Sequence, residues 1–148
     1  MKEILFRGKR KDNGEWIYGV PITDKATGDA YIITSTAGAY LRSEINNMCA
    51  TGFRAIPETV GQYTGLTDKN GTRIFEGDII KSEQDGMIGV IRFGEHQTTN
   101  YGNGECHLGF SIEWYGKYSD LLRRDLGWWI NLKIIGNIYD NPELLKGE

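Results

Sequence analysis

Residues 3–20 of this 148-residue chain read EILFRGKRKDNGEWIYGV. Two runs of β-forming residues, 3–7 and 15–20, stand on either side of a polar segment that ends in Asn13-Gly14. Asparagine and glycine both tolerate the positive φ angles that a tight hairpin turn requires. We therefore predict that the chain opens with a β-hairpin. Strand side chains alternate between two faces, so both aromatic residues of the second strand are expected on one face.

The chain continues as a series of short β-type runs, most of them separated by turns that contain glycine. Phe110, Ile112 and Trp114 alternate with two polar residues, which predicts a strand with one face in the core and one in water. Short strands at this spacing are typical of a small barrel or roll, so we predict a mainly β fold. The predicted strands after the hairpin are residues 30–33, 53–56, 60–63, 73–81, 86–93, 108–115 and 133–139.

Four segments lack this β pattern. Residues 35–52 are small and polar and predict a loop, and the glycine-containing segment 97–106 predicts a flexible connection between two strands. A serine N-cap and a following glycine favour a short helix over residues 119–126. Residues 141–145 predict a final helical turn, with proline in its first position.

Composition restricts the class of protein. Hydrophobic residues make up 39% of the chain and charged residues 25%, which is ordinary for a globular fold. The net charge of −3 argues against a protein whose main task is coating nucleic acid. Two cysteines are too few for a disulfide framework or a zinc ribbon. The N-terminus does not resemble a signal peptide and no run of eighteen apolar residues occurs, so we expect a cytoplasmic protein without membrane contact.

The sequence contains no motif that indicates catalysis or a bound group. It has no phosphate-binding GxxxxGK[ST] loop, and the calcium-like start at Asp68 has Arg73 where glycine is needed. His96, Cys106 and His107 form the only conceivable transition-metal group, but neighbouring strand residues point to opposite faces. We therefore expect no catalytic residue, no cofactor and no metal. An enzyme whose site is built from different subunits is the alternative, because such a site leaves no linear motif.

Arginine and tryptophan gather within residues 123–129. Of two neighbouring tryptophans on a strand, one must face away from the other, which favours one of them at an interface. Arginine and tryptophan anchor many protein contacts and can also clamp a base and a phosphate. The candidate binding surface predicted from the sequence consists of Arg7, Arg123, Arg124, Trp128 and Trp129.

Three stretches carry a resemblance to a known family. The opening hairpin contains FRGK at 6–9 and WIYG at 16–19. The middle contains IPETVGQYTGL at 56–66, DKNG at 68–71 and IFEGDII at 74–80, and the chain closes with IGNIYDNPELL at 135–145. In this order the stretches resemble the YopX proteins of phages and prophages. The resemblance implies an N-terminal β-rich part, an SH3-like roll in the C-terminal half and a homo-oligomer, but no particular activity.

On this basis we predict an N-terminal β-rich subdomain over residues 1–56 and an SH3-like barrel domain over residues 57–148. The leading functional hypothesis is a non-catalytic phage accessory protein, an oligomeric module that binds a host or phage protein. The second is a protein that sequesters a nucleotide immune signal by stacking on tryptophan and pairing arginine with phosphate. The third is nucleic-acid binding through the SH3-like roll and the basic segment 7–11, against which the acidic net charge counts.

Overall fold

A computed structural model describes residues 4–34, 52–83, 86–97, 106–116, 124–125 and 131–146. These residues form two antiparallel sheets, and none of the helices among them reaches seven residues. The prediction of a mainly β fold is thus confirmed. The chain divides into two compact units, Met1–Tyr63 and Thr64–Glu148.

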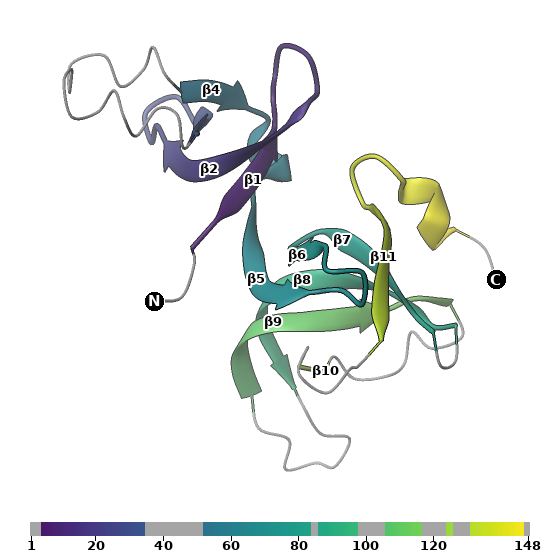
Figure 1. The fold of residues 1–148 in the computed structure, drawn as a ribbon. Coiled ribbons are helices and arrows are strands. Elements are labelled where there is room, and N and C mark those ends of the chain that lie inside the picture. The colour runs from purple at the N-terminus through teal and green to yellow at the C-terminus, as the bar shows by residue number, and fades with distance from the viewer. Residues whose placement is uncertain are drawn as a thin grey trace. The chain divides into compact units, whose positions relative to one another are not determined.

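Four strands of the first unit pair in chain order, each antiparallel to the next (Figure 1). They are β1 (Phe6–Lys9), β2 (Trp16–Thr23), β3 (Ala30–Ile33) and β4 (Gly52–Ala55). The backbone at the end of β1 and just after it also pairs with the backbone of β4 and the residue that follows β4. The Lys11 N–H donates to the Arg54 carbonyl at 2.9 Å, and the Ile56 N–H donates to the Lys9 carbonyl at 2.8 Å. These bonds close the four strands into a small ring.

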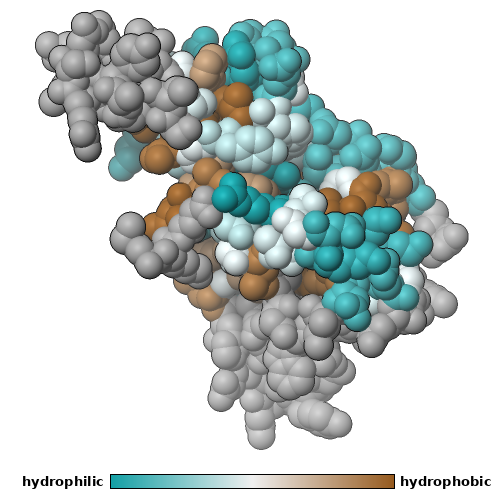
Figure 2. Space-filling model, in the orientation of Figure 1, coloured by the Kyte–Doolittle hydropathy of each residue, from teal (hydrophilic) through white to brown (hydrophobic). Residues whose placement is uncertain are grey.

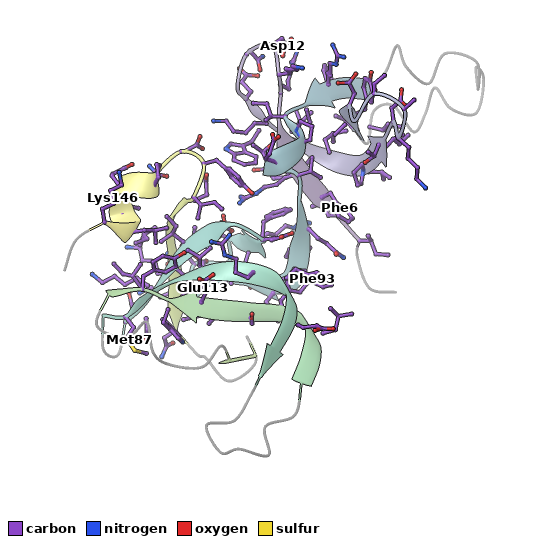
Figure 3. The ribbon with its side chains drawn as sticks, turned by 180° about the vertical axis from the view of Figure 1, so that it is seen from behind. Phe6, Asp12, Met87, Phe93, Glu113 and Lys146 are labelled. Atoms are coloured by element: carbon purple, nitrogen blue, oxygen red, sulfur yellow. The ribbon has the colours of Figure 1, made fainter. Side chains whose placement is uncertain are left out.

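The predicted opening hairpin is confirmed by the pairing of β1 with β2. Gly14 has a φ of +73°, as the Asn-Gly sequence predicts, and its N–H donates to the Arg10 carbonyl at 2.9 Å. Asp12 lies at the end of this hairpin (Figure 3). Gly19 is required for a different reason: a Cβ there would lie 1.9 Å from the Ile33 carbonyl oxygen. A side chain at this position would push β3 away from β2.

The second unit contains a five-stranded antiparallel sheet in the order β10-β9-β8-β7-β11. Its strands are β7 (Asp78–Ser82), β8 (Ile88–Gln97), β9 (Cys106–Trp114), β10 (Arg124–Asp125) and β11 (Leu132–Asn137). Two further strands, β5 (Gly61–Thr67) and β6 (Arg73–Phe75), complete the other sheet, whose order is β4-β3-β2-β1-β5-β6.

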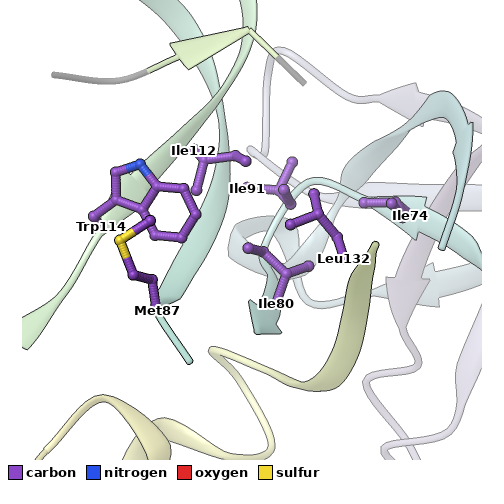
Figure 4. Close-up of a cluster of buried hydrophobic side chains, with 7 residues drawn as sticks. All are labelled: Ile74, Ile80, Met87, Ile91, Ile112, Trp114 and Leu132. Carbon is purple, nitrogen blue, oxygen red and sulfur yellow. The ribbon is translucent and has the colours of Figure 1, made fainter. Parts of the chain in front are cut away.

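The core of the second unit is a cluster of side chains that are at most 5% exposed (Figure 4). Because each buried aliphatic side chain contributes roughly 1.5–3 kcal/mol, such a cluster is the main stabilising element of the unit. Met87 lies beside Trp114, and the aliphatic side chains lie together (Figure 4). The cluster consists of Ile74, Ile80, Met87, Ile91, Ile112, Trp114 and Leu132.

Asp68 ties a turn of the second unit to β11. Its Oδ1 accepts the N–H groups of Asn70 and Thr72, both at 2.9 Å, and its Oδ2 accepts the N–H of Ile134 at 3.2 Å. The Lys69 N–H also donates to the Leu132 carbonyl at 3.1 Å. The turn is therefore held to a strand that lies far away in the sequence.

Three sequence predictions need correction. The run 73–81 is two strands, because Gly77 has a φ of +90° and the Asp78 Oδ2 accepts the Phe75 N–H at 2.8 Å in a turn between them. Arg124–Asp125 belongs to a strand and not to the predicted helix over 119–126, because the edge of β9 offers backbone partners. Ser111, predicted to face water, is 1% exposed because it lies between paired neighbours on β8 and β10.

The final helical turn is confirmed as a 3-10 helix, Pro142–Leu145, with proline at its start. The predicted loop over 35–52 lies outside the described residues except at Gly52, which begins β4. The predicted connection over 97–106 lies outside them as well, apart from its two end residues. Among the described residues, no helix is long and apolar enough to cross a membrane.

Candidate functional site

The structure describes the side chain of only one of the five residues predicted as a binding surface. Arg7 lies in β1 and is 7% exposed, with its guanidinium carbon 4.5 Å from the ring centroid of Trp16. Arg124 lies in β10, where its backbone pairs with Ile112. Arg123, Trp128 and Trp129 are outside the described residues.

Arg7 is brought together with residues of the opening hairpin. In the β1–β2 register, Arg7 is opposite Tyr18 and Lys9 is opposite Trp16, so the four side chains share one face. Lys9 Nζ lies 5.9 Å from the Trp16 centroid, on the same ring that Arg7 covers. A cation held over an indole is attracted by the ring and restrained in position. We call this surface the hairpin face. The alternation of β2 and the tight turn were the sequence signals for it.

The hairpin face continues along β2 as a line of exposed apolar side chains. Tyr18 is 47% exposed, Val20 60% and Ile22 39%. They occupy alternate positions of one strand and so point to the same side. On the face of the molecule drawn in Figure 2, apolar residues (brown) lie at the surface next to polar ones (teal). We call these three residues the β2 strip.

A hollow of about 350 Å³ lies at the end of the hairpin. The Arg10 guanidinium carbon lies 4.4 Å from the ring centroid of Phe53. Arg10 also donates two hydrogen bonds to the Asp12 carboxylate, at 2.9 and 2.6 Å. The contact with the ring and the two hydrogen bonds to the carboxylate together fix the orientation of the Arg10 guanidinium. The hollow is lined by Arg10, Lys11, Asp12, Gly52, Phe53 and Arg54.

The charges around this hairpin-end hollow are coupled in pairs. The hydrogen bond from Arg10 lowers the pKa of Asp12, and the hydrogen bond from Arg54 Nη2 to Asp29 Oδ2, at 2.5 Å, lowers the pKa of Asp29. The same bond to Asp29 raises the pKa of Arg54. Lys11 is exposed and forms no ion pair with a described residue. Its charge helps to lower the pKa of Asp29, but without such an ion pair it is the cation of this hollow that is most available to an anionic ligand.

A second apolar surface lies on β8 and β9 in the other unit. Phe93 is 49% exposed and packs edge-on against Phe110, with ring centroids 5.0 Å apart. Leu108 is 73% exposed and lies two residues before Phe110 in β9. The pair Phe93–Phe110 follows the buried pair Ile91–Ile112 on the same face of the two strands. We call Phe93, Leu108 and Phe110 the ribbon patch.

The residues weighed as metal ligands lie at the far ends of β8 and β9. His96 is opposite His107 in the strand register, and Gln97 is opposite Cys106. Within the part of the chain that the structure describes, no group of three or more histidine, cysteine, aspartate or glutamate residues is arranged to hold a metal ion.

Comparisons with known proteins place the chain in a family. The model of the YopX protein family matches residues 5–146. Among solved structures, the chain is similar to the crystal structure of protein EF1440 from Enterococcus faecalis, with 23% identity and a TM-score of 0.46 over 99% of this chain and 100% of that one. No curated protein sequence matches. Because the family match spans nearly the whole length, the chain belongs to the YopX family.

Proposed function

We propose that this chain is a non-catalytic phage or prophage accessory protein that forms a homo-oligomer in the bacterial cytoplasm, with an SH3-like roll in its second unit. Its task is to bind a host or phage protein. The observation that carries the proposal is the β2 strip, where Tyr18, Val20 and Ile22 stand exposed beside the Arg7–Trp16 stack.

The hairpin face has the composition of a protein-binding surface. Tryptophan and tyrosine are among the residues most often found at energetic centres of interfaces, and the buried Arg7 holds the Trp16 ring in position. They lie on paired strands, so little conformational entropy is lost when a partner binds. Lys9 and the exposed Lys11 add positive charge at one end of the strip. The partner that fits is therefore a protein segment with apolar side chains followed by acidic ones.

The ribbon patch supports the homo-oligomeric part of the proposal. Its phenylalanine pair continues the core face of β8 and β9 beyond the buried isoleucines. A second copy of the chain that covers Phe93 and Leu108 would extend this core. Light scattering of the purified protein should give a defined multiple of the 16.7 kDa chain mass, and Leu108→Glu should lower it to that of one chain. A wild-type mass of one chain would refute this part.

The partner-binding part is tested with Val20→Glu and a matched control, Leu66→Glu. Leu66 is 42% exposed on β5 and outside the strip, so both variants place a carboxylate at an exposed strand position. A protein captured from infected cells is purified and its affinity measured for each variant. We expect at least tenfold weaker binding for Val20→Glu and unchanged binding for Leu66→Glu. Equal affinity of both variants would contradict the proposal.

The hairpin-end hollow favours a second candidate function, the sequestration of a nucleotide immune signal. Arg10, Lys11 and Arg54 could contact phosphates, and Phe53 offers an aromatic ring for a base. Cyclic dinucleotides, cyclic ADP-ribose isomers and linear nucleotides are screened at millimolar concentration by thermal shift. A shift that disappears in Arg54→Gln supports this function, and no shift with any of them rules it out. Binding of nucleic acid, the third alternative, would require a gel shift that weakens steeply with salt.

A further inference from the structure

Two lysines face each other across the β7–β11 pair of the second unit. Lys81 and Lys133 are directly opposite in the register, so both side chains point to the same side of the sheet. Both are exposed, and neither forms an ion pair with a described residue. Like charges at directly opposite positions destabilise an antiparallel pair. The sheet thus carries a repulsion that a bound anion would relieve.

The two lysines border a hollow of about 550 Å³, which is within the size range of small-molecule sites. Among the described residues that line the hollow, Glu83 is the acidic one, and it is already ion-paired with Lys69. Its charge is therefore compensated, and among these described residues the positive charge of the opposed lysines is in excess. Ile135, partly buried, adds an apolar wall. The hollow is lined by Lys81, Ser82, Glu83, Gly86, Lys133 and Ile135.

We propose that this hollow binds a phosphate-bearing small molecule between the ammonium groups of Lys81 and Lys133. A phosphate monoester carries a charge between about −1.5 and −2 at pH 7, which the charges of two lysines can balance. A ligand with a single carboxylate carries less negative charge and would leave one lysine unbalanced. Lysine binds phosphate as a point charge, so the two ammonium groups do not need the fixed bidentate geometry that an arginine guanidinium imposes. This site is separate from the β2 strip, and it adds a ligand to the proposed protein-binding function.

The first test locates binding with inorganic phosphate as the probe. Amide resonances of the labelled full chain are followed at pH 8 during a titration with sodium phosphate and, separately, with sodium chloride at matched ionic strength. We expect saturable shifts at Lys81, Gly86 and Lys133 with phosphate alone. Equal shifts with chloride, or shifts elsewhere only, would overturn the proposal.

The second test uses Lys81→Gln, Lys133→Gln and their double variant, with Lys25→Gln as control. Lys25 is an exposed turn residue of the first unit that does not line the hollow. Each single substitution should weaken phosphate binding about tenfold, and the control should not. Phosphate at ten times its Kd should raise the wild-type Tm by about 3–6 °C.

The double variant separates site binding from a general salt effect. Without phosphate it should melt higher than the wild type at low ionic strength, because the repulsion between the two lysines is removed. With phosphate its Tm should stay unchanged while that of the wild type rises. An equal rise in both proteins would refute the site and leave the partner-binding proposal untouched, because that proposal rests on Val20 and its neighbours.

Discussion

Removing the Asp68 carboxylate should separate a turn of the second unit from β11. Asp68 is 8% exposed, and its two oxygens accept three backbone N–H groups, from Asn70, Thr72 and Ile134. Asp68→Ala removes all three acceptors. Asp68→Asn keeps one oxygen for the turn but places an amide N–H₂ against the Ile134 N–H, so two donors then face each other.

The magnitude follows from which N–H groups can find water. A hydrogen bond to a charged acceptor contributes about 1.5–3 kcal/mol when its loss leaves a buried donor unsatisfied. Asn70 and Thr72 are exposed, so their N–H groups rehydrate, whereas Ile134 is partly buried in β11. We therefore expect Asp68→Ala to lower the free energy of unfolding by about 3 kcal/mol and Asp68→Asn by about 1.5 kcal/mol.

Urea denaturation followed by tryptophan fluorescence measures the loss. With a slope of about 1–3 kcal/mol per molar urea, Asp68→Ala should move the midpoint down by about 1–3 M. Asp24→Ala is the matched control, because Asp24 accepts a single backbone N–H, that of Ala26 at 2.9 Å, in an exposed turn. It should cost no more than about 1 kcal/mol.

Hydrogen exchange at the Ile134 amide gives a local readout of the same contact. In Asp68→Asn this amide should exchange about tenfold faster than in the wild type, because its acceptor has been replaced by a donor. In Asp24→Ala its exchange should be unchanged. The reasoning is refuted if Asp68→Ala moves the urea midpoint no further than Asp24→Ala, or if Ile134 stays equally protected in Asp68→Asn.

Two further predictions concern packing and pH. A Cβ on Gly89 would lie 2.5 Å from Ile112 Cγ2, so Gly89→Ala should destabilise the second unit by about 1–3 kcal/mol. A Cβ on Gly109 would meet nothing within 4 Å, so Gly109→Ala should cost less than about 0.5 kcal/mol. Thermal melts of both variants measure the two losses. The hydrogen bond from Arg54 holds the pKa of Asp29 below its ordinary value of 3.8, so the stability it adds is present above that pH and is lost as the pH falls through the lowered pKa. Carboxyl titration by NMR should show the Asp29 pKa rising toward its ordinary value in Arg54→Gln, because Arg54 is the largest of the groups that lower it. An ordinary value in the wild type would disprove the assignment.

Much of the fold follows from local patterns in the sequence. Asn13-Gly14 predicts the opening turn because few residues tolerate positive φ, and Gly14 has a φ of +73°. The alternation along β2 predicts the face on which Tyr18 and Val20 are found exposed. Proline at the start of 142–145 predicts the last helical turn. Each of these features depends on residues that are close together in the chain.

Two of the three errors arose where pairing with another strand decided the outcome, whereas the run 73–81 is divided by a local turn at Gly77. Ser111 is polar and alternates with apolar residues, yet it is buried because strands pair with β9 on both sides. Arg124–Asp125 has neighbours suited to a helix, but an available strand edge satisfies its backbone instead. Backbone hydrogen bonds offered by a distant strand outweigh weak helix propensity, which differs between ordinary residues by less than about 1 kcal/mol.

By itself, the sequence determined the β class and the opening hairpin with its Asn13-Gly14 turn, because alternation and turn chemistry act over a few residues. Its motifs also indicated the family. Only the tertiary structure decided that Arg7 covers Trp16, that Phe53 lies under Arg10 and that Lys133 is opposite Lys81. The last two pairings depend on strand order and register between segments that are far apart in the chain. No local pattern encodes that register, because it is set by which strands can bury their apolar faces together.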